Sequence, residues 1–131
     1  MTGGGDRLGP EELAELAART GTEKKSDNVI ILDMREVTLV ADYFVILSGS
    51  SRPQVKAIVD HIEKQLEMTG ARPLRCEGYA AARWVLLDYG GVVVHVFHEQ
   101  DRAFYALERL WGDAPARRLD GEATAGTAGG Q

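Results

Sequence analysis

The chain has 131 residues, of which 44% are hydrophobic, and its formal net charge at pH 7 is −5. This length and composition support one hydrophobic core, so we expect a single domain. The acidic balance argues against dominant direct contact with a nucleic-acid backbone, which depends on clustered lysine and arginine, and it favours a basic partner.

Two further features bear on location. No run of about 18 apolar residues is present to span a membrane, and the Gly-rich start lacks the charged and apolar regions of a signal peptide. The single cysteine, Cys76, cannot form an internal disulfide, which fits a reducing compartment. We therefore expect a cytoplasmic protein with no membrane partner.

The first third of the chain predicts one helix and two strands. Pro10 is tolerated at a first helical position, Glu11 and Glu12 complement the positive helix start, and a short apolar stripe follows. We expect this amphipathic helix to end before Gly21. The apolar runs at residues 28–34 and 43–47 have strand length, and both should be buried strands.

A longer helix should follow the second strand. Ser51 is placed to cap it, Pro53 suits its first turn, and Gln54 completes a capping-box pattern. Apolar residues then recur at helical spacing until Gly70: Val55, Ile58, Val59, Ile62 and Leu66. This helix should pack on the sheet, and a short strand is expected at residues 73–76.

The next segment predicts a β-hairpin. Two β-rich runs, residues 84–89 and 92–98, flank Gly90 and Gly91, and paired glycines supply the positive φ angles of tight turns. With a two-residue loop, side-chain alternation pairs three residues of one strand with three of the other: Trp84 with Phe97, Leu86 with His95, and Asp88 with Val93. We call these six residues the hairpin face. The opposite face is almost entirely apolar and should be the buried one, which leaves the hairpin face to solvent or a partner.

The hairpin face is a candidate docking surface. Its aromatic pair forms an apolar centre, while Asp88 and His95 supply polar edges, as in many protein interfaces. Tryptophan often anchors such interfaces, although Trp84 could instead simply cover a sheet edge. Asp101 can cap a final helix, from which Tyr105 would flank the same face. Arg102 could either reach outward to a partner or pair locally with Glu99. We add Arg102 and Tyr105 to the candidate partner-binding residues.

Four motifs resemble one known family in consistent order and spacing across residues 13–114. They are ADYFVILSGSSRPQV at 41–55, EG at 77–78, WVLLDYGGVVVHVF at 84–97 and RAFYALERLW at 102–111. Together they resemble the Iojap or RsfS ribosomal silencing factor family. The family's hairpin tryptophan and aspartate fall on Trp84 and Asp88. Gly91 is a departure, since many relatives carry an acid after the hairpin glycine.

The resemblance implies an α/β fold: a mixed five-stranded sheet flanked by helices, similar to nucleotidyltransferases but without their catalytic residues. It also implies binding to the large ribosomal subunit through the interface ribosomal protein numbered fourteen. Joining of the small subunit would then be hindered, and translation damped when nutrients are scarce. The resemblance implies no enzyme activity and no cofactor.

Two alternatives remain open. Residues 47–51, Leu-Ser-Gly-Ser-Ser, resemble the Gly-Ser turn of nucleotidyltransferases, and amides at a helix start attract anions. Such enzymes hold metal with clustered carboxylates, whereas the following strand offers Glu77 alone. His95 and His98 should point to opposite faces of their strand, which argues against a metal pair. A nucleotide-binding remnant is therefore one alternative, and a self-associating module that uses the hairpin face for a homodimer is the other.

The chain ends should be less structured than its middle. We expect a flexible N-terminus at residues 1–8 and one α/β domain at residues 9–114. Residues 115–131 are rich in glycine and alanine, and small or polar side chains bury too little area to offset the entropy of ordering. We expect that segment to be a disordered tail.

Overall fold

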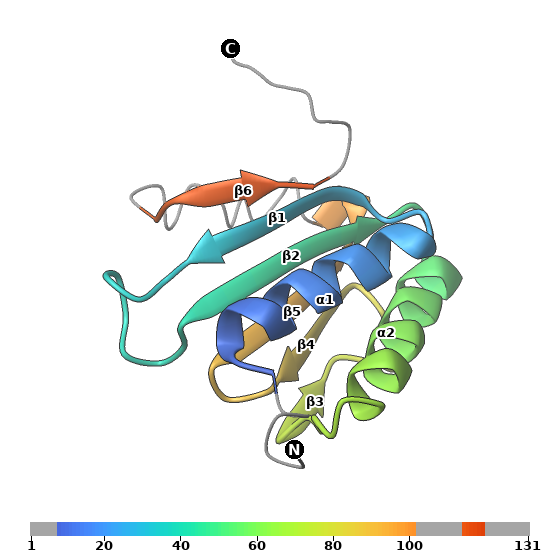
Figure 1. Ribbon diagram of the computed structural model, residues 1–131. Coiled ribbons are helices and arrows are strands. Elements are labelled where there is room, and N and C mark those ends of the chain that lie inside the picture. The colour runs from blue at the N-terminus through green and yellow to red at the C-terminus, as the bar shows by residue number, and fades with distance from the viewer. Residues whose placement is uncertain (1–7, 102–113, 120–131) are drawn as a thin grey trace.

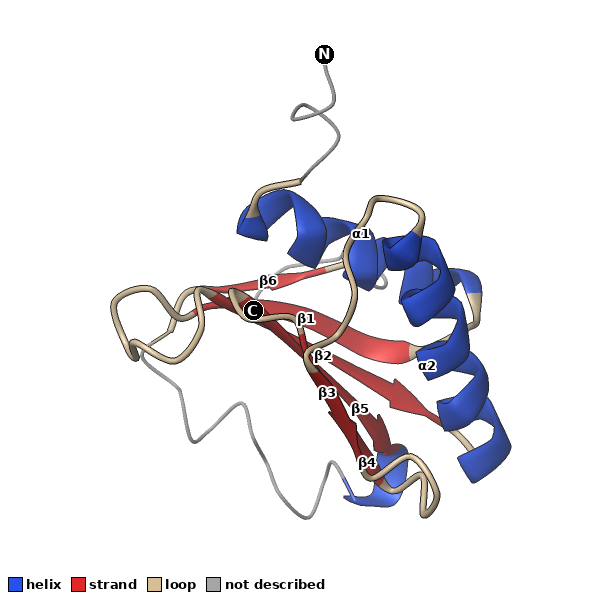
Figure 2. Ribbon diagram, turned by 90° about the horizontal axis from the view of Figure 1, so that it is seen from below, coloured by secondary structure: helices blue, strands red, loops and turns tan. Residues whose placement is uncertain are grey.

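A computed structural model describes residues 8–101 and 114–119. Helices α1 (Pro10–Glu23) and α2 (Arg52–Glu67) lie on the same face of a mixed sheet (Figures 1 and 2). The described part of the chain contributes six strands to this sheet: β1 (Asp27–Asp33), β2 (Tyr43–Gly49), β3 (Arg75–Glu77), β4 (Trp84–Asp88), β5 (Val92–His98) and β6 (Ala116–Arg118). The predicted α/β class with a mixed sheet and flanking helices is confirmed.

The strand order is β3-β4-β5-β2-β1-β6. Strands β2 and β5 pair in parallel at the centre of the sheet, from Tyr43 opposite Val92 to Gly49 opposite His98. All other neighbouring strands pair antiparallel. The chain reaches β5 from β2 through α2, β3 and β4, so the central pairing joins two parts of the chain that are distant in sequence.

Helix α1 begins where the sequence predicts but ends later. The Gly9 N–H donates to the Glu12 carboxylate at 2.9 Å, which satisfies one of the free amides at the helix start. The helix continues through Gly21 to Glu23, so the predicted end before Gly21 is wrong. Gly21 is buried against β2, where a side chain of Leu47 occupies the space that a Cβ would need. This glycine permits close packing and does not terminate the helix.

Helix α2 has the predicted cap and the predicted buried stripe. The Gln54 N–H donates to Ser51 Oγ at 3.2 Å, which is the expected N-cap bond. All five apolar residues of the predicted stripe are fully buried: Val55, Ile58, Val59, Ile62 and Leu66. They pack with residues of α1 and the sheet into a core that we call the helix-side core.

A second core lies on the other face of the sheet. It contains buried residues from β1, β2, β5 and the loops beside them: Ile30, Leu32, Met34, Ala41, Phe44, Ile46, Val93, Phe97 and Ala114. Trp84 and Leu86 of β4 pack against it and are partly buried. We call this group the hairpin-side core, because β4 and β5 carry the candidate docking residues.

The sixth strand is a correction to two predictions, the five-stranded sheet and the disordered tail from residue 115. Ile30, Ile31 and Leu32 of β1 pair with the residues of β6. Arg117 also forms an ion pair with Glu15 of α1, with its Nη1 2.9 Å from Glu15 Oε2. The small and polar side chains of residues 115–131 predicted disorder because they bury little area. β6 instead forms through backbone pairing with the edge of β1, and it buries none of its own three side chains. Residues 1–7 and 120–131 lie outside the described residues.

Candidate docking surface

The hairpin has the predicted register. Trp84 pairs with Phe97, Leu86 with His95, and Asp88 with Val93. The Tyr89 N–H donates to the Val92 carbonyl at 2.8 Å, so Gly90 and Gly91 form the two-residue turn. Of these two glycines only Gly90 has a positive φ, 89°. The sequence predicts a positive φ at both glycines, and this is confirmed for Gly90 and wrong for Gly91.

The hairpin face is less exposed than the sequence predicts. Val93, His95 and Phe97 are buried, and they lie on β5, which has neighbouring strands on both sides. Trp84, Leu86 and Asp88 lie on β4 and are only partly buried. The prediction that the whole face is open to a partner is wrong for the β5 residues. The accessible part of the hairpin face is therefore its β4 row, and the buried β5 side chains lie beside that row.

Trp84 is held in place by polar and aromatic contacts with β5. Its indole Nε1–H donates to His95 Nδ1 at 3.1 Å. Its ring stacks on Phe97, with the ring centroids 5.0 Å apart and the planes at 25°. Phe44 of β2 meets His95 edge-on at a centroid distance of 4.8 Å. These contacts fix the position of a large, partly exposed aromatic side chain, which lowers the entropy that docking through it would cost.

The bond from Trp84 also fixes the protonation of His95. An indole N–H can only donate, so Nδ1 of His95 accepts and the proton of the neutral ring lies on Nε2. His95 Nε2 is buried and has no hydrogen-bond partner. Burial lowers the pKa of His95 from 6.5 to about 4, because the charged ring would lose its hydration. His95 is therefore a neutral acceptor for Trp84 at physiological pH.

Asp88 is engaged within the hairpin and the edge of the sheet. Its Oδ1 accepts from the Gly90 N–H at 2.8 Å, which supports the turn. Its Oδ2 accepts from Arg75 Nε of β3 at 3.2 Å. Arg75 also contacts Glu77 at 2.7 Å. Asp88 thus organises the turn and the β3 edge, a role that the sequence did not assign to it.

The remaining two candidates, Arg102 and Tyr105, lie outside the described residues. Sequence reasoning missed a different surface feature, the loop between β1 and β2. Val37, Leu39 and Val40 project from this loop into solvent. A signal was present in the sequence, since three apolar residues stand in a short stretch that belongs to neither predicted strand.

The Gly-Ser turn before α2 is occupied by contacts within the chain. The side-chain oxygen of Gln54 accepts from the Ser50 N–H at 2.6 Å, and its amide group donates to the carbonyls of Lys24 and Lys25. The turn therefore fastens α2 to the end of α1. Within the described residues, no group of three acidic, histidine or cysteine side chains is arranged to hold a metal ion.

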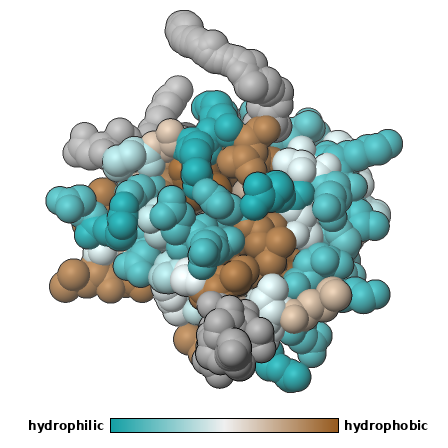
Figure 3. Space-filling model, in the orientation of Figure 1, coloured by the Kyte–Doolittle hydropathy of each residue, from teal (hydrophilic) through white to brown (hydrophobic). Residues whose placement is uncertain are grey.

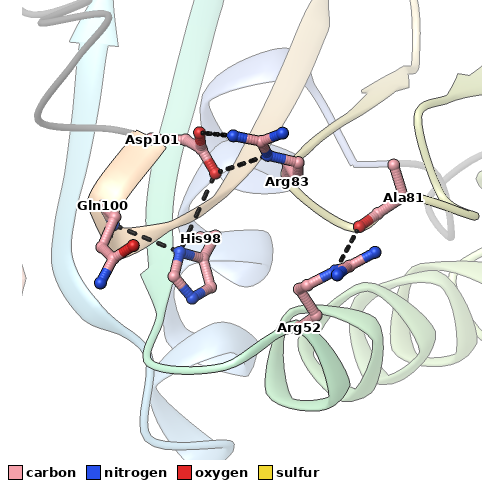
Figure 4. Close-up of polar contacts among 6 residues, drawn as sticks. All are labelled: Arg52, Ala81, Arg83, His98, Gln100 and Asp101. Atoms are coloured by element: carbon pink, nitrogen blue, oxygen red, sulfur yellow. Dashed lines mark hydrogen bonds and ion pairs between the residues drawn. The ribbon is translucent and has the colours of Figure 1, made fainter.

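The charged side chains near this end of the sheet are also engaged (Figure 4). Arg52 Nε donates to the Ala81 carbonyl at 2.9 Å. Arg83 Nη2 lies 3.0 Å from Asp101 Oδ1, and His98 Nδ1 lies 3.9 Å from Asp101 Oδ2. These contacts tie the loop before β4 to the end of β5 and to α2. They hold the hairpin at the end where Trp84 lies.

A mixed sheet with α1 and α2 on one face, and with the aromatic side chains of its β4–β5 hairpin on the other, places the chain among small α/β proteins. The chain belongs to the RsfS family, described as ribosomal silencing factor during starvation, whose model matches residues 8–130. Among the residues that the structure describes, no helix is long and apolar enough to cross a membrane.

Relatives span bacteria and organelles. The Ribosomal silencing factor RsfS of Halalkalibacterium halodurans is 48% identical over 111 residues, covering 85% of this chain and 95% of that protein. A crystal structure of a Chromobacterium violaceum protein superposes with a TM-score of 0.78 at 31% identity, covering 89% of this chain and 98% of that one. The mouse protein named Mitochondrial assembly of ribosomal large subunit protein 1 is 26% identical over 112 residues, covering 83% of this chain and 49% of that protein.

Proposed function

We propose that this chain silences ribosomes by binding the large ribosomal subunit and blocking the small subunit from joining it. Its binding partner on the large subunit is the interface ribosomal protein numbered fourteen, and silencing operates when nutrients are limiting. The observation that carries the proposal is the fixed, partly exposed Trp84 on β4, in a chain that belongs to the silencing-factor family. The name of the mouse relative, which refers to the large subunit, supports that choice of subunit.

The proposed mechanism is steric and requires no catalysis. A protein interface of standard size buries about 800 Å² on each partner. A protein docked over that area leaves no room for a second subunit to approach the same surface. The net charge of −5 favours encounter with a basic ribosomal protein, and this steering should weaken as salt is raised.

Anchoring would come from the β4 row of the hairpin face. Trp84 presents a large ring whose orientation is already set by His95 and Phe97. Leu86 and Asp88 lie on the same face of β4, two and four residues further along the strand. Tryptophan anchors contribute most to binding where surrounding contacts exclude water, and Leu86 and Asp88 are placed to form part of that surround.

The test is sedimentation of purified ribosomal subunits under joining conditions, with and without the protein. We expect the protein to comigrate with the large subunit and the joined particle to disappear. Protein added after the subunits have joined should leave the joined particles intact, because the small subunit then covers the docking surface on the large subunit. This holds for as long as the joined particles do not dissociate on their own. Comigration with neither subunit would refute the proposal.

A further inference from the structure

Exposed apolar side chains gather in the loop between β1 and β2. Leu39 is fully exposed, and 76% of Val40 and 39% of Val37 are exposed. Within the described part of the chain, the other large apolar side chains that are exposed are Met68 and Leu74. Figure 3 shows apolar surface at the left edge of the molecule, where Figure 1 places this loop. Single exposed apolar residues are common, but a cluster of neighbours indicates a contact site.

The loop is folded, and its backbone is hydrogen-bonded. The N–H groups of Val37 and Thr38 both donate to the Met34 carbonyl, at 2.9 and 3.0 Å. The Val40 N–H donates to Thr38 Oγ1 at 3.1 Å. At the base of the loop, the Met34 N–H donates to the Asp42 carbonyl at 2.8 Å. The apolar side chains therefore project from an ordered turn, which lowers the entropic cost of binding through them.

The loop is continuous with the hairpin-side core. Met34 and Ala41, at its two ends, are buried in the same cluster as Val93 and Phe97. The N–H groups of Asp42 and Tyr43 donate to the carbonyl of Gly91 in the hairpin turn, at 2.8 and 3.1 Å. The loop and the hairpin turn therefore meet at one end of the sheet.

We propose that this loop is the second half of the docking surface, with Leu39 and Val40 entering an apolar recess on the same basic ribosomal protein that Trp84 contacts. The inference rests on the function proposed above and adds a contact region to it. Along the strands, roughly 13 Å separates the level of Trp84 from the level of Val93, where the loop begins, and β2 lies two strands from β4, about 10 Å across the sheet. The base of the loop is therefore roughly 16 Å from Trp84. An interface of about 800 Å² is roughly 30 Å across, so one partner can cover both regions.

Local charge favours the same occupant. Asp33, Glu36 and Asp42 lie in or beside the loop, while Arg35 is the single base among residues 33–42. Arg35 pairs with Asp33, with its Nη2 2.7 Å from Asp33 Oδ2. The charges of these two residues cancel, so Glu36 and Asp42 give the loop a net negative charge. An apolar protrusion with an acidic surround complements an apolar recess on a basic protein, whereas two copies of the loop would bring like charges together.

The experiment compares Leu39→Ser with Met68→Ser. Both changes remove an exposed apolar side chain, but Met68 is the C-cap residue of α2, on the helix side of the sheet. We expect Leu39→Ser to weaken binding to purified large subunits about tenfold or more, a typical loss for a central contact. Met68→Ser should bind as the unmodified chain does. Both variants should keep its melting temperature, because the altered side chains touch solvent.

Three results would overturn this inference while leaving the proposed function standing. Leu39→Ser could bind with unchanged affinity, or both variants could lose affinity equally, which would show a general effect of surface polarity. Alternatively, Leu39→Ser could alter only self-association in sedimentation velocity, which would make a second copy the occupant. If the unmodified chain binds neither subunit, the proposed function fails together with this inference. Normal binding of the unmodified chain with normal binding of Leu39→Ser would refute the loop contact alone.

Discussion

The two faces of the sheet differ in what their buried residues do. The helix-side core is formed by apolar and aromatic side chains under α1 and α2. On the other face, His95 is buried among the apolar residues of β2 and β5, and it bonds to a tryptophan that reaches the surface. A buried polar group with an unpaired N–H costs stability. In return, the other ring nitrogen of His95 accepts the bond that holds Trp84, so this buried residue positions a surface side chain as well as packing.

The largest expected effect lies on the helix side. Ile62 of α2 is completely buried in the helix-side core. Ile62→Ala should lower the free energy of unfolding by about 2 to 5 kcal/mol, because it removes buried methyl groups and leaves a cavity. Urea denaturation measures this loss. Binding to large subunits, measured per folded molecule, should not change, and reduced affinity of the folded variant would blur the distinction between the two faces.

The second prediction concerns pH and the buried histidine. The pKa of His95 is about 4 in the folded chain and 6.5 when exposed, so between these values the unfolded chain binds a proton that the folded chain does not. Stability should therefore fall as pH drops from about 6.5 to 4, by about 1.4 kcal/mol per pH unit and about 3 kcal/mol in all from this group.

The control for this prediction is His95→Phe, measured over the same pH range by urea denaturation. The carboxylates titrate in both proteins, so the difference between the two curves isolates His95. We expect the variant to show the shallower slope. Parallel curves would mean that His95 is not a neutral buried group in the folded chain.

Trp84 gives the next largest effect, now on binding. Trp84→Ala should weaken binding to large subunits by about 2 kcal/mol, roughly thirtyfold, if Trp84 is a central anchor. Trp84→Phe retains an aromatic ring against Phe97 but loses the N–H that bonds to His95. Its affinity should therefore lie between those of the unmodified chain and Trp84→Ala. Quantitative cosedimentation distinguishes the three proteins. Unchanged affinity of a folded Trp84→Ala variant would remove Trp84 from the surface.

The smallest effect is expected at the rim of the hairpin. Asp88→Asn keeps an oxygen for the Gly90 N–H but removes the ionic contact with Arg75. The Arg75 side chain is more than half exposed, and such pairs contribute about 0 to 1 kcal/mol. The change in unfolding free energy should lie in this range. A loss of several kcal/mol would show that the β3 edge depends on this pair far more than its exposure suggests.

The hairpin could be predicted in detail because its information is local. Gly90 and Gly91 determine the turn, and alternation then determines which residues face each other, as the observed pairing of Trp84 with Phe97 shows. The buried stripe of α2 was equally readable, since its apolar spacing matches the helical period. Both features depend on residues close together in the chain.

The features that sequence reasoning missed depend on distant partners. Gly21 looked like a helix stop because its contact with Leu47 cannot be read from neighbouring residues. β6 was missed because its pairing partner, β1, lies more than 80 residues earlier. The burial of His95 and Phe97 could not be inferred locally either, because the rings of Phe44 on β2 and Trp84 on β4 pack against them from neighbouring strands.

The parallel pairing at the centre of the sheet has a consequence for synthesis of the chain. Tyr43 of β2 and Val92 of β5 are 49 positions apart, and β5 is the middle partner of both β4 and β2. A nascent chain can form α1, β1 and β2 early, but the two halves of the sheet cannot join until residue 98 has left the exit tunnel. Trp84 gains its support from β5 only at that stage. The Trp84 half of the surface that we propose for ribosome binding would therefore be assembled late in translation, after the loop between β1 and β2, which limits contact between an unfinished chain and the ribosome that is making it.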